Sequence, residues 1–120
     1  MSLGFKQKRA PANLIGDSWE TTGEMDGLRL TNTEDKGANA TQSIDPKGAT
    51  KVTVKYRLIE GEGSIVIGDR APFRNLLNAR GVRKGVQHAE TIHVRGTFKV
   101  GLTTDSLKAG QHSLWQIRIS

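Results

Sequence analysis

The sequence contains no cysteine, so the fold can hold neither a disulfide framework nor a thiolate metal site. Aromatic residues make up only 5% of the 120 residues and hydrophobic residues 35%, which is typical of a small domain with a lean core. No apolar run reaches the length of a membrane span, and the N-terminal MSLGFKQKRAPANL lacks the hydrophobic segment of a signal peptide. We therefore expect one domain that is made in the cytoplasm without a secretion signal.

The clearest structural signal lies between Lys51 and Gly68. Apolar residues occupy every second position in its first half, which predicts a strand with one wet face. Gly61-Glu62-Gly63 follows, and then the apolar run Ser-Ile-Val-Ile-Gly, so we predict a β-hairpin with a glycine turn. The residues that we expect to face the core are Val52, Val54, Tyr56 and Leu58.

The same alternation recurs along most of the chain. It predicts further short strands around residues 13–15, 18–21, 28–31, 40–44, 91–95, 97–102 and 115–119. Eight or nine short strands without an ordinary helix predict an all-β fold, an antiparallel β-sandwich of the jelly-roll kind or a barrel. We assign residues 13–120 to this domain and residues 1–12 to an extended basic N-terminal arm.

The net charge of +6 is unevenly distributed along the chain. Residues 1–12 and 69–87 together hold eight basic residues and one acidic residue, a net charge of +7, which leaves the remainder at −1. Residues 69–87 are also too long for an ordinary hairpin connection, so we predict a long basic loop there, with a helical turn near Phe73 to Leu77. Local basic segments bind phosphates or acidic protein surfaces, although surface lysine and arginine also serve solubility alone.

Motifs that would indicate catalysis or a cofactor are incomplete. Gly16-Asp17-Ser18 resembles the nucleophile block of SGNH-type hydrolases, but no aspartate is followed three residues later by histidine, so we interpret it as a turn. Gly61-Glu62-Gly63 lacks the third glycine of a dinucleotide fingerprint. The three histidines, His88, His93 and His112, lack metal-site spacing. We expect no enzyme activity, no catalytic residues and no metal site.

From Asn13 to Ser120 the rhythm of strands resembles the galactose-binding-like β-sandwich of carbohydrate-binding modules. The segments that carry this resemblance are NLIGDSWETT, DGLRLTNT, NATQSID, VTVKYRLIEGEGSIVIG, ETIHVRGTFKVGLTTDSL and HSLWQIRIS. The resemblance implies a jelly-roll of two sheets, often with a structural calcium ion and a sugar site. The last strand, LWQIR, departs from the family by lacking its calcium-associated aspartate, so we expect no cofactor.

The same fold also serves, without sugar binding, in bacteriophage particles as capsid decoration and tail modules. A lone module with a basic arm and a basic loop resembles this version, so we expect a non-enzymatic structural or binding module of a larger assembly, most simply a phage virion. The residues that we expect to bind partners are Phe5, Lys6, Lys8 and Arg9 in the arm and Arg70, Phe73, Arg74, Arg80, Arg83 and Lys84 in the loop.

The alternatives are a carbohydrate-binding module and a nucleic-acid-binding module. Candidate sugar platforms are Trp19, Phe73 and Trp115, because a pyranose stacks on an aromatic face. Alternation nevertheless favours the core for both tryptophans. Expected partners are, first, protein subunits, either further copies of this chain or capsid and tail proteins. A glycan comes second and nucleic acid third, and we expect no membrane contact.

Overall fold

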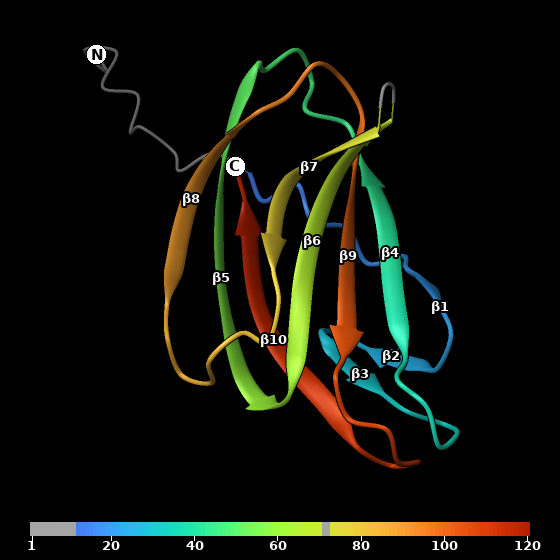
Figure 1. The fold of residues 1–120 in the computed structure, drawn as a ribbon. Coiled ribbons are helices and arrows are strands. Elements are labelled where there is room, and N and C mark those ends of the chain that lie inside the picture. The colour runs from blue at the N-terminus through green and yellow to red at the C-terminus, as the bar shows by residue number, and fades with distance from the viewer. Residues whose placement is uncertain (1–11, 71–72) are drawn as a thin grey trace, which may run out of the picture.

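A computed structural model describes residues 12–70 and 73–120, and all of its regular structure is β (Figure 1). Ten strands form two five-stranded antiparallel sheets packed as a sandwich, which confirms the predicted all-β sandwich and adds at least one strand to the predicted eight or nine. None of the described segments is a helix that could span a membrane. The strands are β1 (Glu20–Thr21), β2 (Glu24–Asp26), β3 (Arg29–Thr31), β4 (Asn39–Ile44), β5 (Lys51–Gly61), β6 (Gly63–Arg70), β7 (Phe73–Ala79), β8 (His88–His93), β9 (Phe98–Thr104) and β10 (His112–Ile119).

Sheet A has the order β1-β4-β9-β6-β7, and sheet B has the order β2-β3-β10-β5-β8. The first two strands of the chain therefore form one edge of the sandwich, and β7 and β8 form the opposite edge. A ladder of seven residue pairs joins β5 to β10 in the middle of sheet B, where Lys55 lies opposite Arg118 and Tyr56 opposite Ile117.

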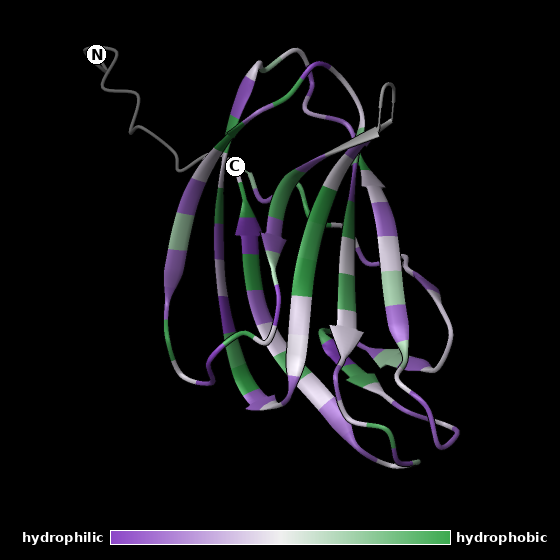
Figure 2. Ribbon diagram, viewed as in Figure 1, coloured by the Kyte–Doolittle hydropathy of each residue, from purple (hydrophilic) through white to green (hydrophobic). Residues whose placement is uncertain are grey.

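The core lies between the sheets and is built by strict alternation. Along β5, Val52, Val54, Tyr56 and Leu58 are all buried, as predicted, while Lys51 and Lys55 are exposed. Figure 2 shows the resulting bands of hydrophobic and hydrophilic residues along the strands. Burying apolar area at roughly 25 cal/mol per Å² is the main force that holds such a fold together. The largest fully buried side chains are those of Trp115, Phe98, Leu30, Leu58, Ile65, Ile67, Leu102 and Ile119.

The predicted hairpin between residues 51 and 68 is wrong. β5 belongs to sheet B and β6 to sheet A, so Glu62 alone carries the chain across from one sheet to the other. The two glycines permit this close passage. Gly61 has φ +79°, and a Cβ atom on it would overlap the carbonyl oxygen of His112. A Cβ atom on Gly63 would lie 2.5 Å from the carbonyl oxygen of Thr103.

The predicted basic loop at residues 69–87 is also wrong as a single irregular segment. β6 continues to Arg70, and β7 returns antiparallel to it, so residues 73–79 form an edge strand in place of the expected helical turn. Among the described residues of the predicted loop, only residues 80–87 are irregular. The strand predicted at residues 13–15 is replaced by an extended segment, and β2 was not expected.

A buried asparagine holds the loops at the end of the sandwich where β3 ends. The side-chain amide of Asn32 donates to the carbonyl oxygens of Ser106 (2.8 Å) and Lys108 (3.1 Å). Its carbonyl oxygen accepts from the backbone N–H of Ala38 (2.9 Å) and from the hydroxyl of Thr104. The β3–β4 and β9–β10 connections are thus tied together by one fully satisfied side chain, as burial of an amide requires.

Replacing Gly61 with alanine tests the passage between the sheets. We expect G61A to lower the free energy of unfolding by about 3 kcal/mol or more, because the methyl group adds a clash with fixed backbone to the strain of a positive φ. G48A is the matched control, since Gly48 has φ +85° but no atom within 4 Å of its Cβ position. We expect G48A to cost only about 1 kcal/mol. Equal losses for the two variants in urea unfolding would contradict this account.

Candidate functional site

Residues 80–87 form an ordered basic loop that joins β7 to β8. Three of its backbone N–H groups donate to β5 and β6: Gly81 to the hydroxyl of Ser64 (2.9 Å), Val82 to the carbonyl of Gly63 (2.9 Å) and Gly85 to the carbonyl of Leu58 (2.8 Å). Val82 packs partly buried against the core, whereas Arg80, Arg83 and Lys84 are exposed. The loop therefore presents three cations from a backbone that is fixed at three points.

The opposite edge of the sandwich is acidic. Residues 17–36 cover β1, β2, β3 and the turns around them, and they contain six carboxylates against Arg29 and Lys36, a net charge of −4. The four carboxylates along the edge itself are all exposed: Asp17, Glu20, Glu24 and Asp26. Since β1 and β2 end their sheets on one side and β7 and β8 on the other, the molecule has an acidic edge and a basic edge.

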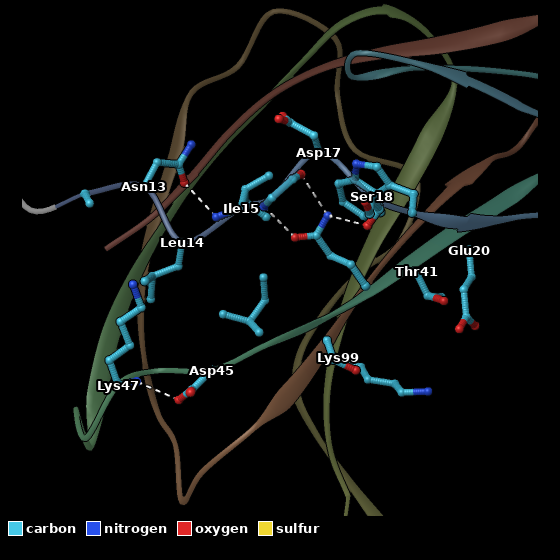
Figure 3. Close-up of a pocket in the computed structure, with 16 residues that line it drawn as sticks. Asn13, Leu14, Ile15, Asp17, Ser18, Glu20, Thr41, Asp45, Lys47 and Lys99 are labelled. Carbon is cyan, nitrogen blue, oxygen red and sulfur yellow. Dashed lines mark hydrogen bonds between the residues drawn. The ribbon is translucent and has the colours of Figure 1, made fainter.

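A groove of about 720 Å³ runs between residues 12–20 and strands β4 and β9, next to the acidic edge (Figure 3). The buried side chain of Gln42 fixes its wall. Its Oε1 accepts from the N–H of Gly16 (2.8 Å), and its Nε2 donates to the carbonyls of Gly16 (3.1 Å) and Ser18 (3.4 Å). A polar residue at a core-facing position of β4 thus holds the Gly16-Asp17-Ser18 segment, which the sequence predicted to be a turn.

The start of this segment is attached to sheet B. The N–H of Leu14 donates to the carbonyl of Ile119 (2.8 Å), and the side chain of Asn13 pairs with the backbone of Ile117 (3.3 Å) and Ile119 (3.0 Å). Asn13 and Leu14 therefore occupy the position beside β10 that β3 leaves open.

The groove carries both charge signs. Asp17, Glu20 and Asp45 are exposed on its rim together with Lys47 and Lys99, and Figure 3 shows the two lysines at separate places around it. Such a lining suits a neutral, hydroxyl-rich or zwitterionic ligand better than a highly charged one.

The candidate sugar platforms have different fates. Trp115 is only 2% exposed and donates its indole N–H to the hydroxyl of Ser113 (2.9 Å), so no ring face is open and its proposed role as a platform is wrong. Tyr56 and Phe98 are buried, as predicted. Trp19 is half-buried against the core and lines the groove.

The side chains of most predicted partner-binding residues lie outside the part of the chain that the structure describes. Phe5, Lys6, Lys8 and Arg9 lie outside the described residues. Arg70, Phe73 and Arg74 belong to the ends of β6 and β7, where only their backbone is described. The three that can be placed, Arg80, Arg83 and Lys84, lie together on the basic loop.

The sequence predicted only part of a second cationic surface. It treated the body of the domain as nearly neutral, but the ladder of β5 with β10 and β8 brings four cations to the outer face of sheet B: Lys51, Lys55, Arg57 and Arg118. Alternation alone could place Lys51, Lys55 and Arg57 on one face. The neighbouring position of Arg118 depends on the order of the strands in the sheet, which alternation does not reveal.

A polar cluster forms where β10 begins. The Nε2–H of His112 donates to Glu60 Oε1 (2.8 Å), and Arg29 Nη2 lies 3.9 Å from the same oxygen. The hydrogen bond from His112 holds the pKa of the Glu60 carboxyl below its usual value. Desolvation opposes this effect, and the positive charges of Arg29, His112 and Lys84 add to it.

The three histidines have separate surroundings. His88 stacks on Tyr56 with ring centroids 4.8 Å apart, His93 is exposed at the end of β8, and His112 binds Glu60. Across residues 12–70 and 73–120, no three histidine, aspartate or glutamate side chains converge as metal ligands would.

Comparison of the chain with models of protein families, with curated proteins and with solved structures finds no match. The assignment of a β-sandwich therefore comes from the structure itself.

The lowered pKa of Glu60 predicts a pH-dependent difference between the protein and E60Q. A carboxyl whose pKa is depressed on folding stabilises the folded state above its unfolded pKa, near 4.5, and loses this contribution as pH falls through the folded value. We therefore expect E60Q to melt at a lower temperature than the wild type at neutral pH, and the gap to close in acid. If the difference in melting temperature between the wild type and E60Q stayed constant from neutral pH into acid, the His112–Glu60 pair would contribute nothing to the pH dependence of stability.

Proposed function

We propose that this chain is a non-enzymatic module of a larger assembly, in which further copies of the chain are its partners. One observation carries the proposal: the acidic edge at β1 and β2 and the basic edge at residues 80–87 lie on opposite sides of one rigid sandwich. The basic edge of one copy therefore complements the acidic edge of the next.

Such a contact joins two different surfaces, so it is heterologous. Heterologous contacts produce rings if the rotation between neighbours closes and filaments if it does not. The three backbone hydrogen bonds that hold residues 80–87 favour a role of this loop in binding, because a loop that is already fixed loses little conformational entropy when it binds.

The class of assembly follows from the resemblance of the strand rhythm to galactose-binding-like sandwiches. Phage particles use that fold as capsid decoration and tail modules, and their symmetry requires repeated subunit contacts. We propose a virion component of this kind, in which the arm at residues 1–12 adds contacts to a neighbouring subunit.

Complementary charge reversal tests the proposed contact. We expect R80E/R83E/K84E and E20K/E24K each to weaken self-association of the full chain at least tenfold in low salt, because the first variant makes like charges face each other and the second brings the net charge of residues 17–36 from −4 to zero. An equimolar mixture of the two variants should associate again as pairs. The first variant keeps the acidic edge and the second keeps the basic edge, so these two edges can still bind each other. Sedimentation equilibrium measures both effects, and K47Q/K108Q is the control for exposed lysines away from the basic edge.

A chain that remains monomeric in low salt at every concentration would contradict the proposal. So would reversal variants that associate as the wild type does.

A carbohydrate-binding module is the second candidate, and the observation that favours it is the half-buried indole of Trp19 in the groove. If a sugar stacks on this ring, W19A should abolish the oligosaccharide binding of the wild type. Calorimetric titration with oligosaccharides measures this loss. An absence of binding by the wild type across neutral and charged oligosaccharides would remove this candidate.

A further inference from the structure

The outer face of sheet B brings cations together in rows. The register places Ala89, Lys55 and Arg118 side by side on β8, β5 and β10, and Arg57 lies beside Gln116 in the next row. Neighbouring strands are about 4.8 Å apart, and residues on one face of a strand repeat about every 6.8 Å. Lys51 continues the same face of β5, where it lies beside His93.

The centre of this face is hollow. A shallow depression of about 570 Å³ is lined by Lys55, Ala89, Gln116 and Arg118, among others. The small side chain of Ala89 leaves room next to the two cations. Arg57 is oriented beside the depression, because its Nη2 donates to the side-chain oxygen of Gln116 (2.8 Å).

The arrangement of charges on this face favours an anionic ligand. Lys55 lies directly opposite Arg118, so cations from two neighbouring strands flank the depression. The outward positions around them, from Lys51 to Arg57 on β5 and on the facing parts of β8 and β10, hold no aspartate or glutamate. An anion bound in the depression would therefore meet positive charges from two neighbouring strands.

The composition of the face distinguishes between kinds of anion. From Lys51 to Arg57, the outward residues of β5 and of its two neighbours are lysine, arginine, threonine, glutamine, histidine and alanine, and the depression also borders Ile117. The centres of protein–protein interfaces are enriched in aromatic residues and depleted in lysine, so an acidic protein is a poor fit. A phosphate backbone requires only positive charges and hydrogen-bond donors on the protein.

We propose that the outer face of sheet B binds the phosphate backbone of a nucleic acid, with a phosphate between Lys55 and Arg118. Lys51 and Arg57 contact the flanking phosphates. The outward positions from Lys51 to Arg57 and beside them hold no tryptophan, tyrosine or phenylalanine on which a base could stack, so this binding is independent of base sequence. The inference does not rest on the proposed self-association, which uses the two edges of the sandwich.

Fluorescence anisotropy with a labelled duplex oligonucleotide of mixed sequence tests this site. We expect the full chain to bind, with an affinity that falls steeply as salt is added. K51Q/K55Q/R57Q should reduce the affinity at least tenfold and lower the slope of log K against log salt by about 3, close to one for each lost phosphate contact. K51R/K55R should retain binding, because it retains the charges.

The control K47Q/K99Q/K108Q removes the same number of charges from other parts of the surface and should bind nearly as the wild type does. Thermal melts identify any variant that is misfolded, and sedimentation of K51Q/K55Q/R57Q should show unchanged self-association. Four results would overturn the proposal: no binding by the wild type in low salt, equal losses in the control, binding lost only in R80E/R83E/K84E, or equal affinity for polyglutamate.

Discussion

The passage of the chain from β5 to β6 through Glu62 is the constraint on which the sandwich depends. It places two consecutive strands in different sheets, so that the core-facing residues of both point at each other across the interior. At this corner the sheets approach so closely that the hydroxyl of Ser113 in sheet B reaches the carbonyl of Thr103 in sheet A (3.5 Å). A Cβ atom on Gly63 would lie 2.7 Å from the indole of Trp115. Glycine at position 63 leaves room for Trp115, the largest side chain of the core, and glycine at position 61 leaves room for the backbone of His112.

This corner also positions the basic loop. Gly63, Ser64 and Leu58 accept the three hydrogen bonds that hold residues 80–87, and all three lie at or near the passage. The cations of the loop are therefore fixed by the same local geometry that separates the sheets. Charge is thus sorted by position: acidic residues at the edge where the chain begins its strands, basic residues at the opposite edge, and a third, cationic surface on the outside of sheet B. An interaction module needs such ordered surfaces more than it needs a deep cavity.

The sequence predicted well what alternation alone decides, and poorly what depends on the partner of each strand. The inward positions of β5 and the burial of Tyr56, Phe98 and Trp115 follow from a period of two, and so does the all-β class. The hairpin was wrong because two glycines around one residue suit a tight turn and a passage between sheets equally well. β7 was missed because its apolar pair, Leu76 and Leu77, breaks alternation at an irregular pairing with β6. The cationic face was predicted only in part, because Arg118 joins the three cations of β5 from a strand about sixty residues further along the chain.

The most direct test of the proposed assembly is zero-length cross-linking of carboxylates to amines, performed on a mixture of isotopically light and heavy protein. Mass spectrometry of mixed-isotope peptides then identifies bonds between two copies of the chain. The account predicts cross-links from Lys84 of one copy to Glu20 or Glu24 of another, lost when salt dissociates the assembly. Cross-links between copies that join other surfaces and never these two edges would contradict it.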